Sequence, residues 1–467
     1  MKWGSHSWRL FKISSIVRST LTELEEKGRW DSEYFSPQYL DLEHALEKLN
    51  TVPLGRLAKV TGSAFYPAAT EIYADDGLPF IRVLDTIENP IIYRDDNIQH
   101  IPKSFVESNN SIITLKPLEI VVSKVGTPCY SSLIDEAVGE CALSRTVLGV
   151  TKIKSDLIDP YYLLAFLRSE IGFQQLYRER EQQIQLQLTL DRVRNIKVLI
   201  PEFPEQIRIR KLLIEYRENL EKAKNLHETA KKSIESKFNL DETKNTFTTT
   251  LDSIILHERL DPEFYNPIFE SLLNQMKTKS DSFKTIGELF KIQKGIEVGA
   301  QQYTDDGPIF LRVSNLDEVE LNLGEIRRIS KDLYQAIKDK FRPNKGEFLI
   351  SKDASTGIFY LLREDEDMII SGGIVRGILR HEHYDLDRDY LITVLNSEMI
   401  KLQSKRNENG SVIKHWPISQ LKKTIVPILQ PEDQKEIGDL IRLSYYHRSL
   451  AYKRYNEALS SITGLIS

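Results

Sequence analysis

The sequence predicts an α+β protein in which two globular parts of mixed helices and strands alternate with two long helices. Two observations lead to this prediction. The stretch YADDGLPFIRVLD (Tyr73–Asp85) returns as YTDDGPIFLRVSN (Tyr303–Asn315), a separation of 230 between positions 73 and 303. Each half of the chain also ends in a run with apolar residues at steps of three and four, as in a helix that packs along one side. A domain-sized unit is therefore expected twice in the 467 residues.

Other words return in the same order. RWDSEYFSP (Arg29–Pro37) reappears as RLDPEFYNP (Arg259–Pro267), again 230 positions on. YLLAFLRSE (Tyr162–Glu170) reappears as YLITVLNSE (Tyr390–Glu398), 228 positions on. Because the order and the spacing are both kept, chance recurrence of strand and turn residues is a poor explanation. We expect an internal repeat with a pseudo-twofold relationship.

The globular parts are expected to hold short strands and helices. Runs such as LPFIRVL, EIVVSKV and EFLIS are rich in β-branched and aromatic residues, which favours strands. The words ADDG and TDDG are turn signals before a strand. The run YYLLAFLRSEIGFQQLY has the length and period of a helix.

The two long helices are expected to pair as an antiparallel coiled coil. Each begins after a proline and an acidic residue, as helices commonly do. A surface helix packed on its own domain is the alternative explanation of the stripe. The expected parts are residues 1–203, 204–240, 241–430 and 431–467. The residues predicted to form the helix seam are Ile209, Leu213, Leu220, Ile234, Ile437, Ile441, Ala451 and Ile462.

The composition is that of an ordinary globular protein, with 40% hydrophobic and 28% charged residues. The net charge of −5 argues against a globally basic nucleic-acid coat but allows a local basic groove. No apolar run approaches the ~20 residues of a membrane helix, so no membrane association is expected. The two cysteines, Cys129 and Cys141, are expected to be reduced in a cytoplasmic protein.

No motif for catalysis or nucleotide binding is present in the sequence. A P-loop, a Rossmann glycine pattern and an HExxH zinc motif are all missing. The word HEHYDLDRD (His381–Asp389) has the residue types of a metal site, but the other half of the chain has SDLIDPYY at this place. We therefore predict a solvated loop there, no bound metal and no catalytic residues.

The order of parts and several words resemble the specificity subunit of type I restriction–modification systems. These words are RLDPEFYNP, GEFLISKDASTG and the passage NGSVIKHWPISQLKKTIVPILQPEDQKEI, with QIQLQLTLDRVRNIKVLIPEFPEQIRIRKLL at the matching place. The first passage lacks the Gly-Ser pair of the second, so the two loops are expected to meet DNA differently.

This resemblance implies that each globular part is a target recognition domain for one half of a split sequence in double-stranded DNA. It implies docking of two methyltransferase subunits, and of restriction or translocase subunits where these exist. The chain itself would not be an enzyme and would hold no cofactor. S-adenosylmethionine, ATP and magnesium would belong to the partner subunits.

The DNA contacts are predicted from residue type and position. Lys124 and Lys352 each follow a matching strand, in VVSKVGTP and LISKDASTG. Arg82 and Arg312 also recur, but each lies two residues from an expected core Phe, so a structural role is an equal alternative. Further candidates precede the long helices, where a solvated face is the competing explanation: Arg194, Lys197, Lys414 and Lys422.

Two other classes of function stay open at this point. One is a coiled-coil scaffold that binds only proteins, which predicts no salt-sensitive DNA binding. The other is a fused methyltransferase or nuclease whose motifs are not recognisable.

Overall fold

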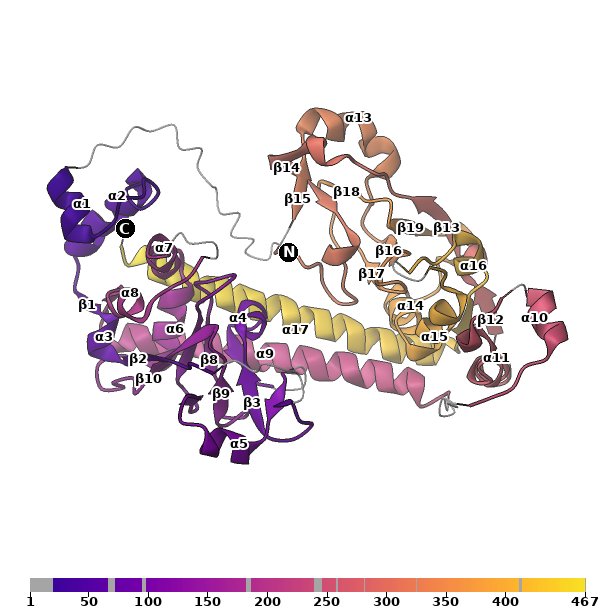
Figure 1. The fold of residues 1–467 in the computed structure, drawn as a ribbon. Coiled ribbons are helices and arrows are strands. Elements are labelled where there is room, and N and C mark those ends of the chain that lie inside the picture. Colours follow the sequence, from indigo (N-terminus) through magenta and orange to yellow (C-terminus); the bar gives the residue numbers. More distant parts are fainter. Residues whose placement is uncertain are drawn as a thin grey trace. The chain divides into compact units, whose positions relative to one another are not determined.

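The computed structural model describes residues 20–466, with gaps at 66–71, 95–97, 182–185, 239–245, 258, 281, 325 and 411–413 (Figure 1). The chain divides into two compact units. Among the described residues, the first unit comprises residues up to 220 and from 450 on, and the second comprises residues between 221 and 449. Each unit contains a globular part and a segment of both long helices, whereas the expected division counted the long helices as separate parts. That four-part division stays a prediction.

The first unit is built on three small sheets. The strand orders are β2-β10-β7-β8-β4, β5-β3-β9-β6 and β1-β11. The strands of the largest sheet are β2 (Lys59–Gly62), β10 (Val147–Thr151), β7 (Ile120–Ser123), β8 (Ser131–Ile134) and β4 (Ile91–Ile92). The remaining strands are β5 (His100–Ile101), β3 (Leu78–Ile81), β9 (Cys141–Leu143), β6 (Thr114–Leu115), β1 (Thr51–Pro53) and β11 (Lys197–Leu199).

Short helices cover these sheets. They are α1 (Leu21–Lys27), α2 (Pro37–Glu47), α3 (Leu54–Leu57), α4 (Val83–Glu88), α5 (Lys103–Ser108), α6 (Pro160–Arg168), α7 (Glu170–Arg178) and α8 (Leu190–Arg194). Helix α6 begins where the Asp159 carboxylate accepts hydrogen bonds from the backbone N–H groups of Tyr161 and Tyr162. Seven consecutive residues of α6 are then buried, which places this helix in the core.

The second unit has a comparable set of strands. Their orders are β13-β19-β16-β17, β15-β14-β18 and β12-β20. The bounds are β12 (Ser282–Thr285), β13 (Phe290–Lys294), β14 (Tyr303–Leu311), β15 (Arg327–Ile329), β16 (Phe348–Ser351), β17 (Phe359–Leu361), β18 (Met368–Ile370), β19 (Ile374–Leu379) and β20 (Ile425–Ile428). The strands predicted in EIVVSKV and EFLIS are β7 and β16. All four residues of each are buried, because both faces of these strands are covered.

The helices of the second unit are α10 (Leu251–His257), α11 (Ile268–Lys279), α12 (Ile286–Leu289), α13 (Lys331–Phe341), α14 (Arg388–Leu395), α15 (Glu398–Asn407) and α16 (Ile418–Leu421). The described part of this unit also contains the 3₁₀ turns η2 (Pro262–Tyr265), η3 (Ala300–Gln302), η4 (Val313–Asn315) and η5 (His381–His383). The mixed α/β class predicted from the sequence is therefore confirmed.

Two helices are much longer than the rest, α9 (Phe203–Glu235) and α17 (Pro431–Gly464). In the first unit the Tyr216 ring of α9 lies 5.0 Å from the Tyr455 ring of α17, and Glu215 forms a 2.6 Å ion pair with Arg454. In that unit Arg208 also donates to the Ser461 hydroxyl at 2.8 Å. Residue numbers rise along one segment while they fall along the other, so the two segments are antiparallel.

The second unit contains the other parts of α9 and α17. Here Ser444 Oγ donates to the Ala223 carbonyl at 2.6 Å, and Lys237 Nζ lies 2.8 Å from Asp433 Oδ2. These segments are again antiparallel. Seven predicted seam residues are buried and Leu220 is half-buried, because the stripe of each helix faces a neighbour. Among the described residues, no helix is long and apolar enough to cross a membrane.

Candidate nucleic-acid interface

In the second unit, a loop after strand β16 lies against the stem of a second loop. The Ala354 N–H donates to the Lys414 carbonyl at 2.9 Å, and the Trp416 N–H donates to the Lys352 carbonyl at 2.7 Å. Ala354 has a φ of +58°, a left-handed conformation that costs energy outside glycine. The buried Trp416 side chain anchors the stem. Residues 352–357 and 409–416 therefore form one surface, although 411–413 lie outside the described residues.

The charges on this surface are arranged around Asp353. Lys352 Nζ donates to Asp353 Oδ2 at 2.6 Å, and only 7% of Lys352 is exposed. His415 Nδ1 also bonds to the Asp353 carboxylate. Burial alone would raise the pKa of Asp353, but the bonds from Lys352 and His415 outweigh it and lower that pKa. The Lys352 ammonium is thus neutralised within the protein, while Lys414 is exposed.

Arg259 contacts residues 408 and 409, at the start of the second loop of this surface. Its guanidinium donates to Asp261 at 2.6 Å, to the Asn409 side chain at 3.0 Å and to the Glu408 carbonyl at 3.1 Å. The hydrogen bond from Arg259 lowers the pKa of Asp261. Arg259 belongs to the recurring word RLDPEFYNP, so its recurrence was the signal for it. Sequence reasoning did not select Asp353 or His415, because neither residue type recurs in the other half.

The first unit has the same arrangement of main chain. The Lys124 N–H donates to the Thr146 carbonyl at 2.9 Å, and the Leu188 N–H donates to the Lys124 carbonyl at 3.0 Å. Val125 forms a bridge with Gln187, as Asp353 does with His415. The Lys124 side chain is half-buried. In the part of the chain that the structure describes, it has no ion-pair partner. The segment QQIQ of the facing loop, residues 182–185, lies outside the described residues.

The recurring arginines occupy equivalent places at the ends of β3 and β14. The Arg82 N–H donates to Asp85 Oδ2 at 2.7 Å, and the Arg312 N–H donates to Asn315 Oδ1 at 3.1 Å. Both residues therefore precede a short helical turn, α4 or η4. The phenylalanines two residues earlier, Phe80 and Phe310, are buried as expected. These contacts belong to the backbone of the two arginines and fix the turn after each strand, while contact of the arginine side chains with DNA stays a prediction.

The remaining candidates differ in exposure. Arg194 forms a 2.7 Å ion pair with Asp191 and donates to the Val60 carbonyl at 3.1 Å. Lys197 lies 3.6 Å from Glu47 and is half-buried. Lys422 is exposed, as Lys414 is. The structure brings Lys352 and Lys414 together on one surface.

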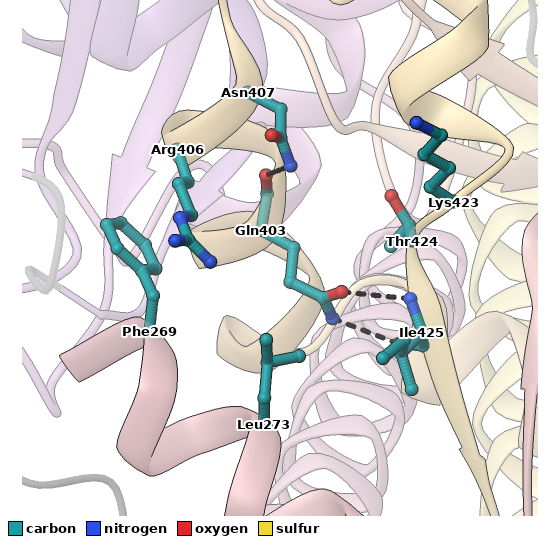
Figure 2. A pocket seen from close by; sticks show the side chains of 8 residues that line it. All are labelled: Phe269, Leu273, Gln403, Arg406, Asn407, Lys423, Thr424 and Ile425. Atoms are coloured by element: carbon teal, nitrogen blue, oxygen red, sulfur yellow. Dashed lines mark hydrogen bonds between the residues drawn. The ribbon is translucent and has the colours of Figure 1, made fainter. Parts of the chain in front are cut away.

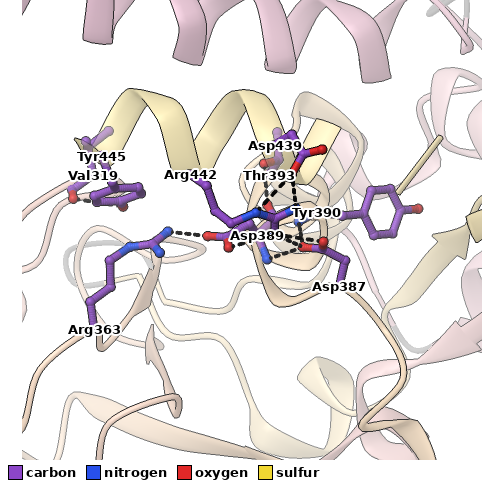
Figure 3. Close-up of polar contacts among 9 residues, drawn as sticks. All are labelled: Val319, Arg363, Asp387, Asp389, Tyr390, Thr393, Asp439, Arg442 and Tyr445. Atoms are coloured by element: carbon purple, nitrogen blue, oxygen red, sulfur yellow. Dashed lines mark hydrogen bonds and ion pairs between the residues drawn. The ribbon is translucent and has the colours of Figure 1, made fainter. Parts of the chain in front are cut away.

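The word HEHYDLDRD contains no metal cluster within the described residues. Two of its three aspartates, Asp387 and Asp389, instead join α14 to the long helix α17 within the second unit, as Figure 3 shows. Asp387 caps α14, and Arg442 donates to Asp387 at 2.8 Å and to Asp389 at 3.1 Å. The sequence prediction of a solvated loop is wrong for these two carboxylates, because Arg442 engages both and Asp389 is buried.

Further contacts occur at matching positions of the two units. Gln206 Oε1 accepts from the Asp159 N–H at 2.8 Å, and Gln434 Oε1 accepts from the Asp387 N–H at 3.3 Å. These glutamines attach the start of each long helix to the globular part of its own unit. The class defined by fold and surface is thus an α/β protein whose two units carry the same loop-and-stem contacts.

Comparison with known proteins shows what parts of the chain are similar to. Residues 280–457 match the model of the type I restriction modification DNA specificity domain. The chain is 22% identical over 183 residues to the type I restriction enzyme EcoBI specificity subunit of Escherichia coli. That alignment covers 38% of this chain and 38% of the relative, well short of the relative's full length.

Two solved structures are similar over most of the chain. The S subunit of a type I restriction-modification system from M. genitalium is 13% identical, with a TM-score of 0.41 over 89% of this chain and 93% of that one. The HsdS subunit from Thermoanaerobacter tengcongensis is also 13% identical, with a TM-score of 0.28 over 89% of this chain and 95% of that one. The resemblance to specificity subunits is confirmed.

Proposed function

We propose that this chain is the DNA-recognition subunit of a type I restriction–modification complex and reads a bipartite target, one half-site with each unit. One observation carries the proposal. The family model matches residues 280–457 and therefore no part of the first unit's globular region. The contacts between the loop after β16 and the loop stem at His415 nevertheless recur in that region, around Lys124 and Gln187. Two units with the same framework and different loops suit two unlike half-sites.

Accessible lysines on and near the loop-and-stem surfaces are the proposed phosphate contacts. Lys414 is exposed on the surface of the second unit, and half-buried Lys124 stands in the first unit where Lys352 stands in the second. Lys422, exposed directly after α16, is a further candidate outside that surface. Lysine on a loop suits contact with DNA phosphates, which position the protein without specifying sequence. Sequence is read in this proposal by the facing loops, where QIQLQL and GSVIKH differ at almost every position. Arg82, Arg194, Lys197 and Lys352 remain weaker candidates, because each side chain already pairs with a carboxylate of the protein. Arg312 is also a weaker candidate, because its backbone N–H is part of the turn that follows β14.

The long helices are proposed to pair along their length as an antiparallel coiled coil that holds the half-sites apart and relates the units by a pseudo-twofold axis. The Tyr216–Tyr455 and Ala223–Ser444 contacts support this pairing, each within its own unit. A pseudo-symmetric scaffold would offer two similar docking sites, which suits two methyltransferase subunits.

Catalysis is assigned to the partners in this proposal. The chain would not be an enzyme and would hold no cofactor. S-adenosylmethionine, ATP and magnesium would serve methyltransferase and restriction subunits. Because its ligand is the cell's DNA, the proposed compartment is the cytoplasm.

The test is to purify the chain with its methyltransferase subunit and map methylated sites genome-wide. A split motif with two fixed halves is the expected result. Binding to protein partners alone, with no salt-sensitive DNA binding, would favour the scaffold alternative. Methyl transfer or DNA cleavage by the isolated chain would favour a fused enzyme.

A further inference from the structure

Each unit has a pocket at the matching place. In the first unit it lies between α2 and α7, and in the second unit it lies between α11 and α15. In the second unit the pocket has a volume of about 150 Å³ and lies between α11, α15 and the start of β20 (Figure 2). In the first unit the pocket has a volume of about 290 Å³ and lies between α2, α7 and the start of β11. Both are large enough for several water molecules.

A glutamine and an arginine occupy both pockets in the same way. Gln175 bonds to the backbone N–H and C=O of Lys197 at 2.9 and 3.1 Å, and Gln403 bonds to those of Ile425 at 2.9 and 2.9 Å. Arg178 Nε donates to the Tyr34 carbonyl at 2.9 Å, and Arg406 Nε donates to the Phe264 carbonyl at 3.1 Å. The two pockets therefore correspond residue by residue.

The two pockets differ in the charged side chains around the arginine. In the first unit Arg178 Nη1 donates to Glu43 Oε2 at 2.9 Å, and Glu43 also pairs with Lys27. Glu179 next to Arg178 pairs with Arg192 at 3.2 Å. Lys27, Arg178 and Arg192 of this pocket thus each form an ion pair with a glutamate.

In the second unit both carboxylates are replaced. The residue matching Glu43 on α11 is Leu273, and the residue matching Glu179 is Asn407. Lys423 adds a second cation at the place of Asn195. The pocket lining therefore contains two cations and no carboxylate.

Arg406 is held in position but has no ion pair with any residue that the structure describes. Its guanidinium lies 4.7 Å from the Phe264 ring centre and 5.3 Å from that of Phe269. Burial lowers the pKa of Arg406. Glu270 acts in the opposite direction from outside ion-pair distance, and Arg259 lowers the pKa further. A half-buried guanidinium with a fixed stem and unused terminal nitrogens is ready to receive two oxygens of an anion.

We propose that the pocket of the second unit binds a phosphate group through Arg406, with Lys423 at its rim, and that the pocket of the first unit does not. Glu43 already occupies the corresponding place in the first unit. The phosphate is either a free ion or a group of the DNA backbone. The proposal does not require that the chain reads DNA.

Two reciprocal substitutions test this. Leu273→Glu installs the carboxylate of the first pocket next to Arg406, and half-exposed Leu273 leaves room for a polar side chain. Leu273→Gln is the uncharged control of the same size. Glu43→Leu removes the carboxylate from Arg178. The melting temperature of the full chain is measured against inorganic phosphate, with chloride holding the ionic strength constant.

The melting temperature of the wild type and of Leu273→Gln is expected to rise with phosphate and then saturate, because the ligand binds only the folded state. Leu273→Glu is expected to lose that rise, and Glu43→Leu to gain a larger one. An equal response in Leu273→Glu and Leu273→Gln would overturn the proposal, as would no response in the wild type.

The salt dependence of duplex DNA binding identifies the source of the phosphate. If the group is a backbone phosphate, Leu273→Glu lowers the salt slope of duplex binding by about one unit. If it is a free ion, that slope stays unchanged while the response to phosphate is still lost. Absence of all DNA binding in the wild type would contradict the proposed function and leave the phosphate result to decide the pocket.

Discussion

Lys352 Nζ lies 2.6 Å from Asp353 Oδ2, and His415 bonds to the other oxygen of the same carboxylate. Lys352 is 7% exposed. An ammonium in this position acts first on the fold of the loop, since the removal of one partner leaves a part-buried charge without its main contact.

Lys352→Ala is therefore expected to lower the free energy of unfolding by about 1–3 kcal/mol. Urea denaturation of Lys352→Ala, Asp353→Ala and the double variant measures the coupling between the two residues. If their effects simply add, the ion pair does not stabilise the loop. A lower salt slope of DNA binding in Lys352→Ala would show that Lys352 contacts DNA as well.

Lys414→Ala and Lys124→Ala are expected to weaken DNA binding without loss of stability. Each phosphate contact contributes roughly one unit to the salt slope, so each substitution should reduce that slope by about one. Affinity for duplex DNA across a salt series is the measurement. Lys103→Ala is the control, because Lys103 is an exposed lysine on α5 away from the loop. Equal slopes for all three variants would place both lysines outside the interface.

His227 in α9 predicts a pH dependence of stability. Burial, followed by the nearby charges of Arg448 and Lys231, lowers the pKa of His227 to about 4. The unfolded chain has an ordinary histidine pKa of about 6.5, so it binds more protons than the folded chain between these values. The free energy of unfolding should therefore decrease as the pH falls from about 6.5 to about 4, by about 1 kcal/mol per pH unit.

The measurement is the difference between the wild type and His227→Gln across that range, since other groups titrate in both. Gln keeps a polar side chain and removes the titration. A difference that does not change with pH would show that His227 keeps an ordinary pKa in the folded protein.

Matched insertions in both long helices test the proposed spacing of half-sites. Seven residues after Leu220 and seven after Ser449 add one heptad to each helix and keep the seam facing its partner. The gap should lengthen by up to ~10 Å, or about three base pairs. The methylated motif of cells that also carry the methyltransferase subunit is the measurement.

Five-residue insertions at the same points are the control, because they turn the seam by about 140°. They should abolish methylation. An unchanged gap in an active complex with the seven-residue insertions would contradict the proposed role of the helices.

Exchange of residues 36–200 for the matching part of a relative tests the assignment of half-sites. Only one half of the methylated motif should change, because each unit is proposed to read its own half. A change in both halves would contradict independent reading. A matched exchange in the second unit should alter the other half.

The pattern of apolar residues along the sequence was sufficient to predict the two long helices and strands β7 and β16. The heptad stripe through Ile209 and Ile437 predicted the long helices, because burial of one face imposes a period on the residues themselves. Strands β7 and β16 were predictable for a similar reason, since a strand covered on both faces must be apolar throughout. Recurrence of whole segments predicted an internal repeat, but it did not single out the matching contacts of Gln175 and Gln403.

Which charges remain available to a ligand was decided only by the tertiary structure. Lys124 and Lys352 follow matching strands, and the sequence puts Val125 after one and Asp353 after the other. Only folding brings His415 from a distant loop onto the Asp353 carboxylate that pairs with Lys352. Arg178 and Arg406 occupy matching positions as well, and the difference between them depends on position 43 or 273, on a helix distant in sequence. Charge pairing depends on distances of a few ångströms between segments far apart in the chain, and a pattern along one segment does not contain those distances.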